Sequence, residues 1–242
     1  LLNPEFKGKA SILNIPSIGI MDAAMVNEAL GTVKYGDKGN IVGDPEGAKQ
    51  ASLIEAELAK KPDGLVVSMA NPDALASSLK AATEAGVPFI TINSGAEESK
   101  AMGALEHIGQ TETVAGQGAG QRLAEGGAKK LLCIVHEAGN IGLEQRCDGA
   151  AEAFGGSFEK LQVDLANPQG IEATVKSKLL GDNSFDAVLS LNPTVTTATL
   201  AGMEAAGSTA ELASFDIDTD VLQAIKDDKV AFTVDQQQYL QG

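Results

Sequence analysis

Short apolar runs alternate with amphipathic segments from about residue 45 to the end of the chain. The runs are rich in Val, Ile and Leu, as expected of buried strands, and the segments between them repeat apolar residues with the period of a helix. We predict strands at residues 64–68, 88–92, 131–135, 161–163, 187–190, 212–215 and 230–234. The predicted helices cover about residues 46–61, 73–85, 113–126, 141–153, 168–179, 195–206 and 218–226. This alternation is typical of parallel βαβ units, so the predicted fold class is α/β with parallel sheets.

The alternation weakens in residues 94–112, which are small, polar and only weakly periodic. We interpret this stretch as a crossover between two lobes, each built from a parallel sheet covered by helices. A chain of 242 residues is long enough for two lobes that each have a hydrophobic core.

Hydrogen-bonding residues follow almost every predicted strand. In parallel α/β sheets, ligands bind at the carboxyl ends of the strands, so these positions are candidates for a binding site. The residues are Ser68, Asn71, Asn93, Ser94, His136, Glu137, Asn192, Thr194, Asp216, Asp235 and Gln236. Loops are polar in most proteins, but amides and acids at six strand ends favour a polar ligand. Three interpretations of the final run, residues 232–242, stay open: a site for a polar ligand, a hydrated hinge or a disordered tail.

Composition and charge exclude several classes of protein. Hydrophobic residues make up 43% of the chain and charged residues 21%, which is ordinary for a globular protein. The net charge of −15 repels phosphate backbones, so we expect no nucleic-acid partner. No apolar stretch approaches the ~20 residues that a membrane helix needs. The chain opens without a signal peptide, which predicts either a cytosolic protein or a processed one.

The two cysteines, Cys133 and Cys147, are too few for a zinc site of cysteines alone, and only His136 is close by in sequence. From their number alone, free thiols and a disulfide are equally compatible with the sequence.

Three motifs that suggest chemistry fail on inspection. The run "GQGAGQ" (116–121) lies in a helical pattern rather than after a strand, so small residues for close helix packing explain it better than a nucleotide loop. The run "HEAGN" (136–140) lacks the second histidine of a zincin. The run starting at Asp216 lacks the glycine of a calcium loop, and Asp218 is better explained as a helix N-cap. With no nucleophile–base pair visible, we predict no enzymatic activity, no cofactor and no metal.

Several segments, taken together and in order, resemble type I periplasmic solute-binding proteins, the sugar receptors of bacterial ABC transporters similar to ribose-binding protein. The resemblance covers about residues 41–242. It is carried by "DGLVVS" (63–68), "NPDAL" (71–75), "AGVPFITIN" (85–93), "HIGQTETVAGQGAGQRL" (107–123), "KKLLCIVHEAGNIGLEQRCDG" (129–149), "FDAVLSLNPT" (185–194) and the run from Phe215 to Gly242.

The resemblance implies two Rossmann-like lobes that close on a sugar, with a permease as the transport partner. It implies lobe 1 at residues 1–104, with residues 235–242 returning to it, and lobe 2 at residues 105–234. The implied ligand contacts are Asn93, Arg146, Asn192, Asp216 and Gln236, with His136 as a weaker candidate. Carboxylates, amides and an arginine fork are suited to sugar hydroxyls.

The resemblance also implies a location and a state of the cysteines. We expect a monomer that works in the periplasm or as a lipid-anchored extracellular protein. Disulfides persist in these compartments, and Cys147 lies on a predicted helix that folds back over the strand of Cys133, so we expect the two to be joined.

Both ends of the chain depart from this family. The C-terminal end is expected to be truncated, because the family continues beyond Gly242. Residues 1–40 look more like a type II, polyamine-type solute-binding protein, although "ASILNI" (10–15) can still supply a strand.

Two other classes compete with the receptor. The effector core of a LacI-like transcription regulator shares the fold but would need a basic DNA-binding N-terminus. A nucleotide-dependent oxidoreductase would need a glycine fingerprint. The sequence does not choose among sugars.

Overall fold

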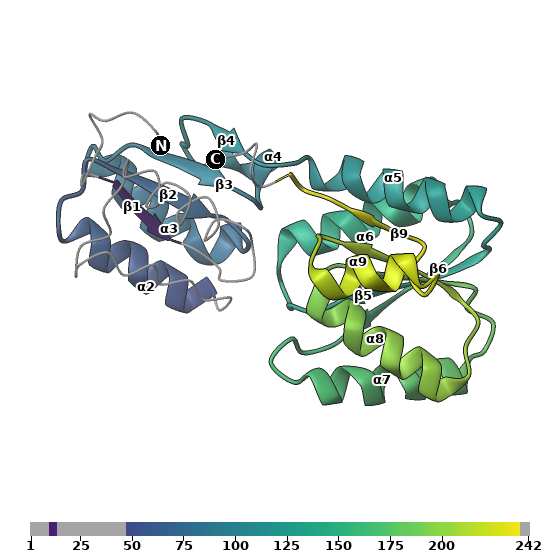
Figure 1. The fold of residues 1–242 in the computed structure, drawn as a ribbon. Coiled ribbons are helices and arrows are strands. Elements are labelled where there is room, and N and C mark those ends of the chain that lie inside the picture. Colours follow the sequence, from purple (N-terminus) through teal and green to yellow (C-terminus); the bar gives the residue numbers. More distant parts are fainter. Residues whose placement is uncertain (1–9, 14–46, 238–242) are drawn as a thin grey trace. The chain divides into compact units, whose positions relative to one another are not determined.

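The computed structural model describes residues 10–13 and 47–237, and these form two compact units (Figure 1). Among them, unit 1 contains residues 10–13, 47–110 and 237, and unit 2 contains residues 111–236. This division falls after residues 110 and 236, a few residues beyond the predicted boundaries after residues 104 and 234. Residues 107–108 pair with the first sheet, which keeps them in unit 1. Gln236 donates a hydrogen bond to Asp216, which holds it in unit 2.

Unit 1 contains a parallel sheet of four strands in the order β1-β2-β3-β4. Its elements, in chain order, are β1 (Ala10–Leu13), α2 (Gly47–Leu58), β2 (Gly64–Ser68), α3 (Pro72–Glu84), β3 (Phe89–Ile92), α4 (Ala96–Ser99) and β4 (His107–Ile108). The strand expected within "ASILNI" is confirmed as β1, which pairs with β2. The chain passes from unit 1 to unit 2 between Gln110 and Thr111, within the crossover predicted at residues 94–112, but the same stretch also contains α4 and β4.

Unit 2 contains a parallel sheet of five strands in the order β6-β5-β7-β8-β9. Its elements are α5 (Glu112–Glu125), β5 (Lys130–Val135), α6 (Ile141–Phe154), β6 (Ser157–Gln162), α7 (Pro168–Gly181), β7 (Ala187–Ser190), α8 (Pro193–Ala206), β8 (Glu211–Phe215), α9 (Thr219–Lys226) and β9 (Phe232–Val234). The predicted strand at 161–163 was placed too late. β6 is an edge strand with polar residues on both faces, so it carries no apolar run.

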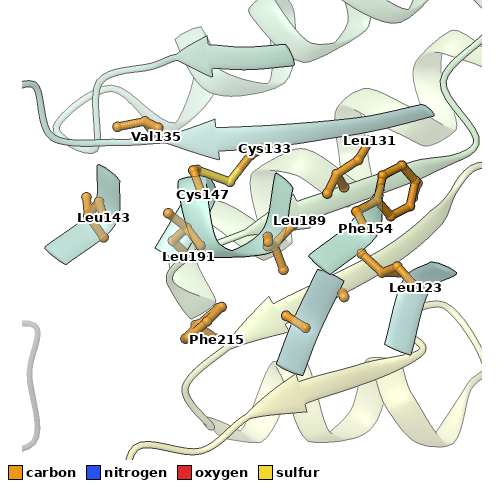
Figure 2. Packing of buried hydrophobic residues seen from close by; sticks show 14 of the residues in the cluster. Leu123, Leu131, Cys133, Val135, Leu143, Cys147, Phe154, Leu189, Leu191 and Phe215 are labelled. Atoms are coloured by element: carbon orange, nitrogen blue, oxygen red, sulfur yellow. A yellow bond between two sulfur atoms is a disulfide. The ribbon is translucent and has the colours of Figure 1, made fainter. Parts of the chain in front are cut away.

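Alternate residues of β5 belong to two different hydrophobic clusters, one on each face of the unit 2 sheet. Leu131 and Cys133 pack with residues of α5 and α6. Leu132 and Ile134 pack with residues of α7, α8 and α9. Helices therefore cover both faces, which explains why strands β5 and β7 are almost wholly apolar. Figure 2 shows the first cluster, in which a disulfide joins Cys133 to Cys147 as the resemblance implied, with the Cα atoms 5.9 Å apart.

Glycines bring α5 and α6 into close contact. A Cβ atom placed on Gly116 would lie 2.1 Å from the carbonyl oxygen of Arg146, and one on Gly120 would lie 2.1 Å from that of Ala150. From the other helix, a Cβ on Gly149 would lie 2.2 Å from the carbonyl oxygen of Thr113. Only hydrogen atoms fit at these positions. The explanation of "GQGAGQ" as a helix-packing run is therefore confirmed.

Candidate functional site

Four predicted site residues lie at one edge of the unit 2 sheet. His136 follows β5, Asn192 follows β7, Asp216 follows β8 and Gln236 follows β9. These strands are parallel neighbours, so their carboxyl ends meet at the same edge. All four side chains are buried. Burying polar side chains without partners is costly, so a cluster of them at a sheet edge is unlike an ordinary loop surface.

Arg146 reaches the same edge from α6, and Glu112 holds it there. Its Nε donates to Glu112 Oε2, and its Nη2 donates to Glu112 Oε1 over 3.0 Å. A third donor, Nη1, lies 3.4 Å from the carbonyl oxygen of Leu191, the residue before Asn192. The guanidinium also lies over the ring of Phe215, 4.7 Å from its centroid. Burial alone would lower the pKa of Arg146, but the carboxylates of Glu112, Asp216 and Glu137 together outweigh it and raise that pKa.

Asp216 occupies a left-handed backbone conformation, with φ at 65°, directly after β8. Asp and Asn tolerate this region better than most residues. Its carboxylate accepts a hydrogen bond of 2.5 Å from the side chain of Gln236. Its backbone is fixed by β9, since its N–H donates to Val234 and its carbonyl accepts from Thr233. The turn therefore directs an acid and an amide to one point at the sheet edge.

Asn192 has a structural role that the sequence analysis did not predict. Its Oδ1 caps α8 by accepting from the backbone N–H groups of Thr194, at 2.9 Å, and Val195, at 3.4 Å. Only the NH₂ group of this side chain is left to bind anything beyond the cap. Beneath it, the hydroxyls of Thr196, Ser190 and Ser214 form a buried network, and Thr196 also donates to the Asn192 carbonyl.

His136 is an uncharged group within this charged cluster. Burial, followed by the nearby positive charge of Arg146, lowers the pKa of its imidazole to about 4. The side chain is only 6% exposed, and its Nδ1 has no hydrogen-bond partner among the described residues. A buried ring nitrogen in this state can accept or donate a hydrogen bond, depending on the tautomer.

In unit 1, as at Asp216 in unit 2, a polar residue with a left-handed backbone directly follows a strand. Asn93 follows β3 and is left-handed, with φ at 63°. Its Nδ2 lies 3.1 Å from the hydroxyl of Ser94 and 3.5 Å from that of Ser68. Its Oδ1 is buried and has no partner within the described part of the chain. Asn93 thus carries a buried acceptor without a partner among the described residues, at the carboxyl end of β3.

Glu112 and Phe215 both contact Arg146 at this site, and neither was predicted to belong to it. Glu112 is 1% exposed and belongs to the first turn of α5. The only local signal was an acid at a helix start, which the helix dipole explains without any partner. Phe215 was assigned to a strand, and nothing in that pattern indicates an arginine over its ring.

Asp218 confirms one prediction, because its side chain caps α9 by accepting from the N–H of Val221 at 2.7 Å. Within residues 10–13 and 47–237, no group of three or more His, Cys, Asp or Glu side chains could hold a metal ion. The helices in that part of the chain are also too short or too polar to cross a membrane.

Comparison with known proteins matches this chain to one family. The sequence model of that family, described as a periplasmic binding protein domain, matches residues 23–242. The match includes residues 23–40, so the expectation that all of residues 1–40 resemble a different type is wrong for that part.

Individual relatives agree with the family match. The chain is 27% identical to the ribose import binding protein of Bacillus subtilis over 207 residues, which cover 81% of this chain and 65% of the relative. A carbohydrate transporter from Acidothermus cellulolyticus, solved in complex with myo-inositol, superposes with a TM-score of 0.86 at 33% identity, covering 96% of this chain and 82% of that one. A periplasmic sugar-binding protein from Legionella pneumophila has the same fold, with a TM-score of 0.82 at 22% identity and coverage of 96% and 90%.

Proposed function

The chain belongs to the periplasmic binding protein domain family, and from that premise we propose that it is the substrate-binding receptor of a bacterial ABC transporter. It captures a monosaccharide or a similar polyol and delivers it to a permease, as a monomer and without enzymatic activity. Arg146, Asn192, Asp216, Gln236 and His136 bind the ligand from unit 2.

One observation carries this proposal, the convergence of an arginine, an acid, two amides and a neutral histidine at the ends of four neighbouring strands. Each hydroxyl of a polyol both donates and accepts a hydrogen bond, so its recognition needs both kinds of group close together. The guanidinium donates, the Asp216 carboxylate accepts, and the amide of Gln236 can do both. In unit 1, the buried Oδ1 of Asn93 makes this residue a further proposed contact.

The relatives support a cyclic polyol rather than a polyamine. The 33% identical structure holds myo-inositol, and the Bacillus relative is a ribose import protein. The Cys133–Cys147 disulfide favours a location outside the cytoplasm, because cytosolic thiols are kept reduced.

The test is ligand binding by the chain and by two variants. A thermal-shift panel of pentoses, hexoses, inositols and polyamines identifies the ligand, and calorimetry should then give one site per chain. We expect Arg146→Ala and Asp216→Ala each to weaken binding by about 2–5 kcal/mol, because each removes a buried charged group that binds the ligand. Arg146→Ala also leaves the carboxylate of Glu112 unpaired, and Asp216→Ala leaves the amide of Gln236 without its acceptor.

Arg122→Ala is the matched control. Arg122 also lies over a phenylalanine ring of unit 2, that of Phe232 at 4.4 Å, but it is exposed and lies on α5 near its C-terminal end. Unchanged affinity in both site variants would refute the assigned site. Binding of polyamines alone would refute the assigned ligand class.

A further inference from the structure

We propose that Glu112 positions Arg146 for the ligand and balances its charge, so that the site takes neutral polyols in preference to acidic sugars. This inference rests on the proposed function. Glu112 acts through Arg146 rather than by contact with the ligand, so we call it a positioning residue.

The packing of α5 on α6 holds Glu112 opposite Arg146. Gly116, one helical turn after Glu112, lies against the backbone of Arg146 so closely that a side chain would not fit. Glu112 is 1% exposed and Arg146 4% exposed, so water does not compete for the pair. The two hydrogen bonds fix the guanidinium along its Nε–Nη2 edge, which leaves it little rotational freedom.

The geometry leaves part of the guanidinium available. Of its five N–H groups, two serve Glu112 and one serves the carbonyl of Leu191. The two remaining N–H groups belong to Nη1 and Nη2. The hydrogen bond from Nη1 to the carbonyl of Leu191 holds the guanidinium next to Asn192 at the sheet edge. Donors fixed before the ligand arrives bind it with less loss of conformational entropy.

The charges of the cluster argue against an acidic ligand. Arg146 is its cation, and the buried carboxylate of Glu112 neutralises it. The other charged groups that act on Arg146 are Asp216 and Glu137, both of them acids, and His136 is neutral above a pH of about 4. Among the described residues of this cluster, a ligand carboxylate would therefore meet two acids and no uncompensated cation. A buried charge without a partner is costly.

The experiment replaces Glu112 in the full chain and measures affinity for neutral and anionic probes by calorimetry. The neutral probes are myo-inositol, D-ribose and D-glucose, and the anionic probe is D-glucuronate, which is D-glucose with a carboxylate at C6. Glu112→Gln keeps the shape but removes the charge. We expect it to weaken binding of the neutral probes by about tenfold or more. The affinity ratio between D-glucose and D-glucuronate should shift toward D-glucuronate by a similar factor.

A second variant separates position from charge. Glu112→Asp keeps the charge but is one methylene shorter, so we expect neutral binding to weaken severalfold while the preference for the neutral probe is retained. It also provides the measurement if Glu112→Gln does not fold. Glu125→Gln, which removes an exposed acid from the other end of α5, is the control and should bind like the unmodified chain.

Two results would overturn the inference. One is folded Glu112→Gln protein with unchanged affinities. The other is an equal loss for both classes of probe together with a lower thermal midpoint, which would make the ion pair purely structural. If Glu112→Gln does not fold, Glu112→Asp protein that binds like the unmodified chain overturns it. If the unmodified chain binds no neutral probe, the proposed function fails first, and this inference fails with it.

Discussion

Replacing Gly116 by alanine should destabilise unit 2, whereas the same change at Gly118, two residues along the same helix, should not. The Cβ of an alanine at 116 would lie 2.1 Å from the carbonyl oxygen of Arg146 and 2.8 Å from its carbonyl carbon. Nothing lies within 4 Å of the corresponding atom at Gly118. The two substitutions therefore share their chemistry and differ only in what the new methyl group meets.

The magnitude follows from the geometry. An ordinary contact of about 3.4 Å requires α5 and α6 to separate locally by about 1.3 Å, and the obstacle is backbone, which cannot rotate away. Overpacking of this kind costs about 1–3 kcal/mol or more. The higher helix propensity of alanine over glycine stabilises both variants by up to about 1 kcal/mol, so it does not change the difference between them. We therefore expect Gly118→Ala to be neutral or slightly stabilising and Gly116→Ala to be less stable than Gly118→Ala by about 1–3 kcal/mol.

Urea unfolding followed by far-UV circular dichroism measures the difference, and hydrogen exchange of peptides from α5 and α6 assigns it to unit 2. Because the displaced backbone carries Arg146, the Gly116 variant should also lose ligand affinity. Equal stability of the two alanine variants would refute the packing argument, since the same methyl group would then cost nothing against α6.

Two further predictions concern the strand ends. The pKa of His136 is about 4 in the folded protein, against 6.5 for a free histidine. Between pH 6.5 and pH 4 the unfolded chain therefore binds a proton at His136 that the folded protein does not bind. The free energy of unfolding should fall as the pH drops through this range. At 1.36 kcal/mol per pKa unit the loss is about 3 kcal/mol, and His136→Asn should flatten this part of a plot of urea midpoint against pH; an unchanged slope contradicts the assignment. Asn192→Ser keeps an N-cap oxygen but removes the NH₂ group, so it should keep the unfolding midpoint and weaken ligand binding, while a lower midpoint with unchanged affinity would make Asn192 only a cap.

The sequence by itself determined the alternation of strands and helices and, through it, the edge at which polar residues gather. An apolar run of strand length between helical patterns is a local signal, and β2 and β7 begin and end at the predicted residues. The parallel arrangement then places whatever follows each strand at one edge, which explains why Asn192, Asp216 and Gln236 could be named before the structure. β6 was not placed correctly from this signal, because an edge strand with polar residues on both faces has no apolar run.

Only the tertiary structure decided how these residues act on one another. Glu112 and Arg146 are 34 positions apart, and their pairing depends on how closely α5 approaches α6. The glycine run predicted close packing but not the partner helix or the residue opposite Gly116. Likewise, an asparagine after a strand can cap a helix or bind a ligand. A sequence pattern contains no interatomic distances, so it does not distinguish these two roles. Side-chain partners come from contacts across the fold, whereas periodicity reports only which face of its own element a residue occupies.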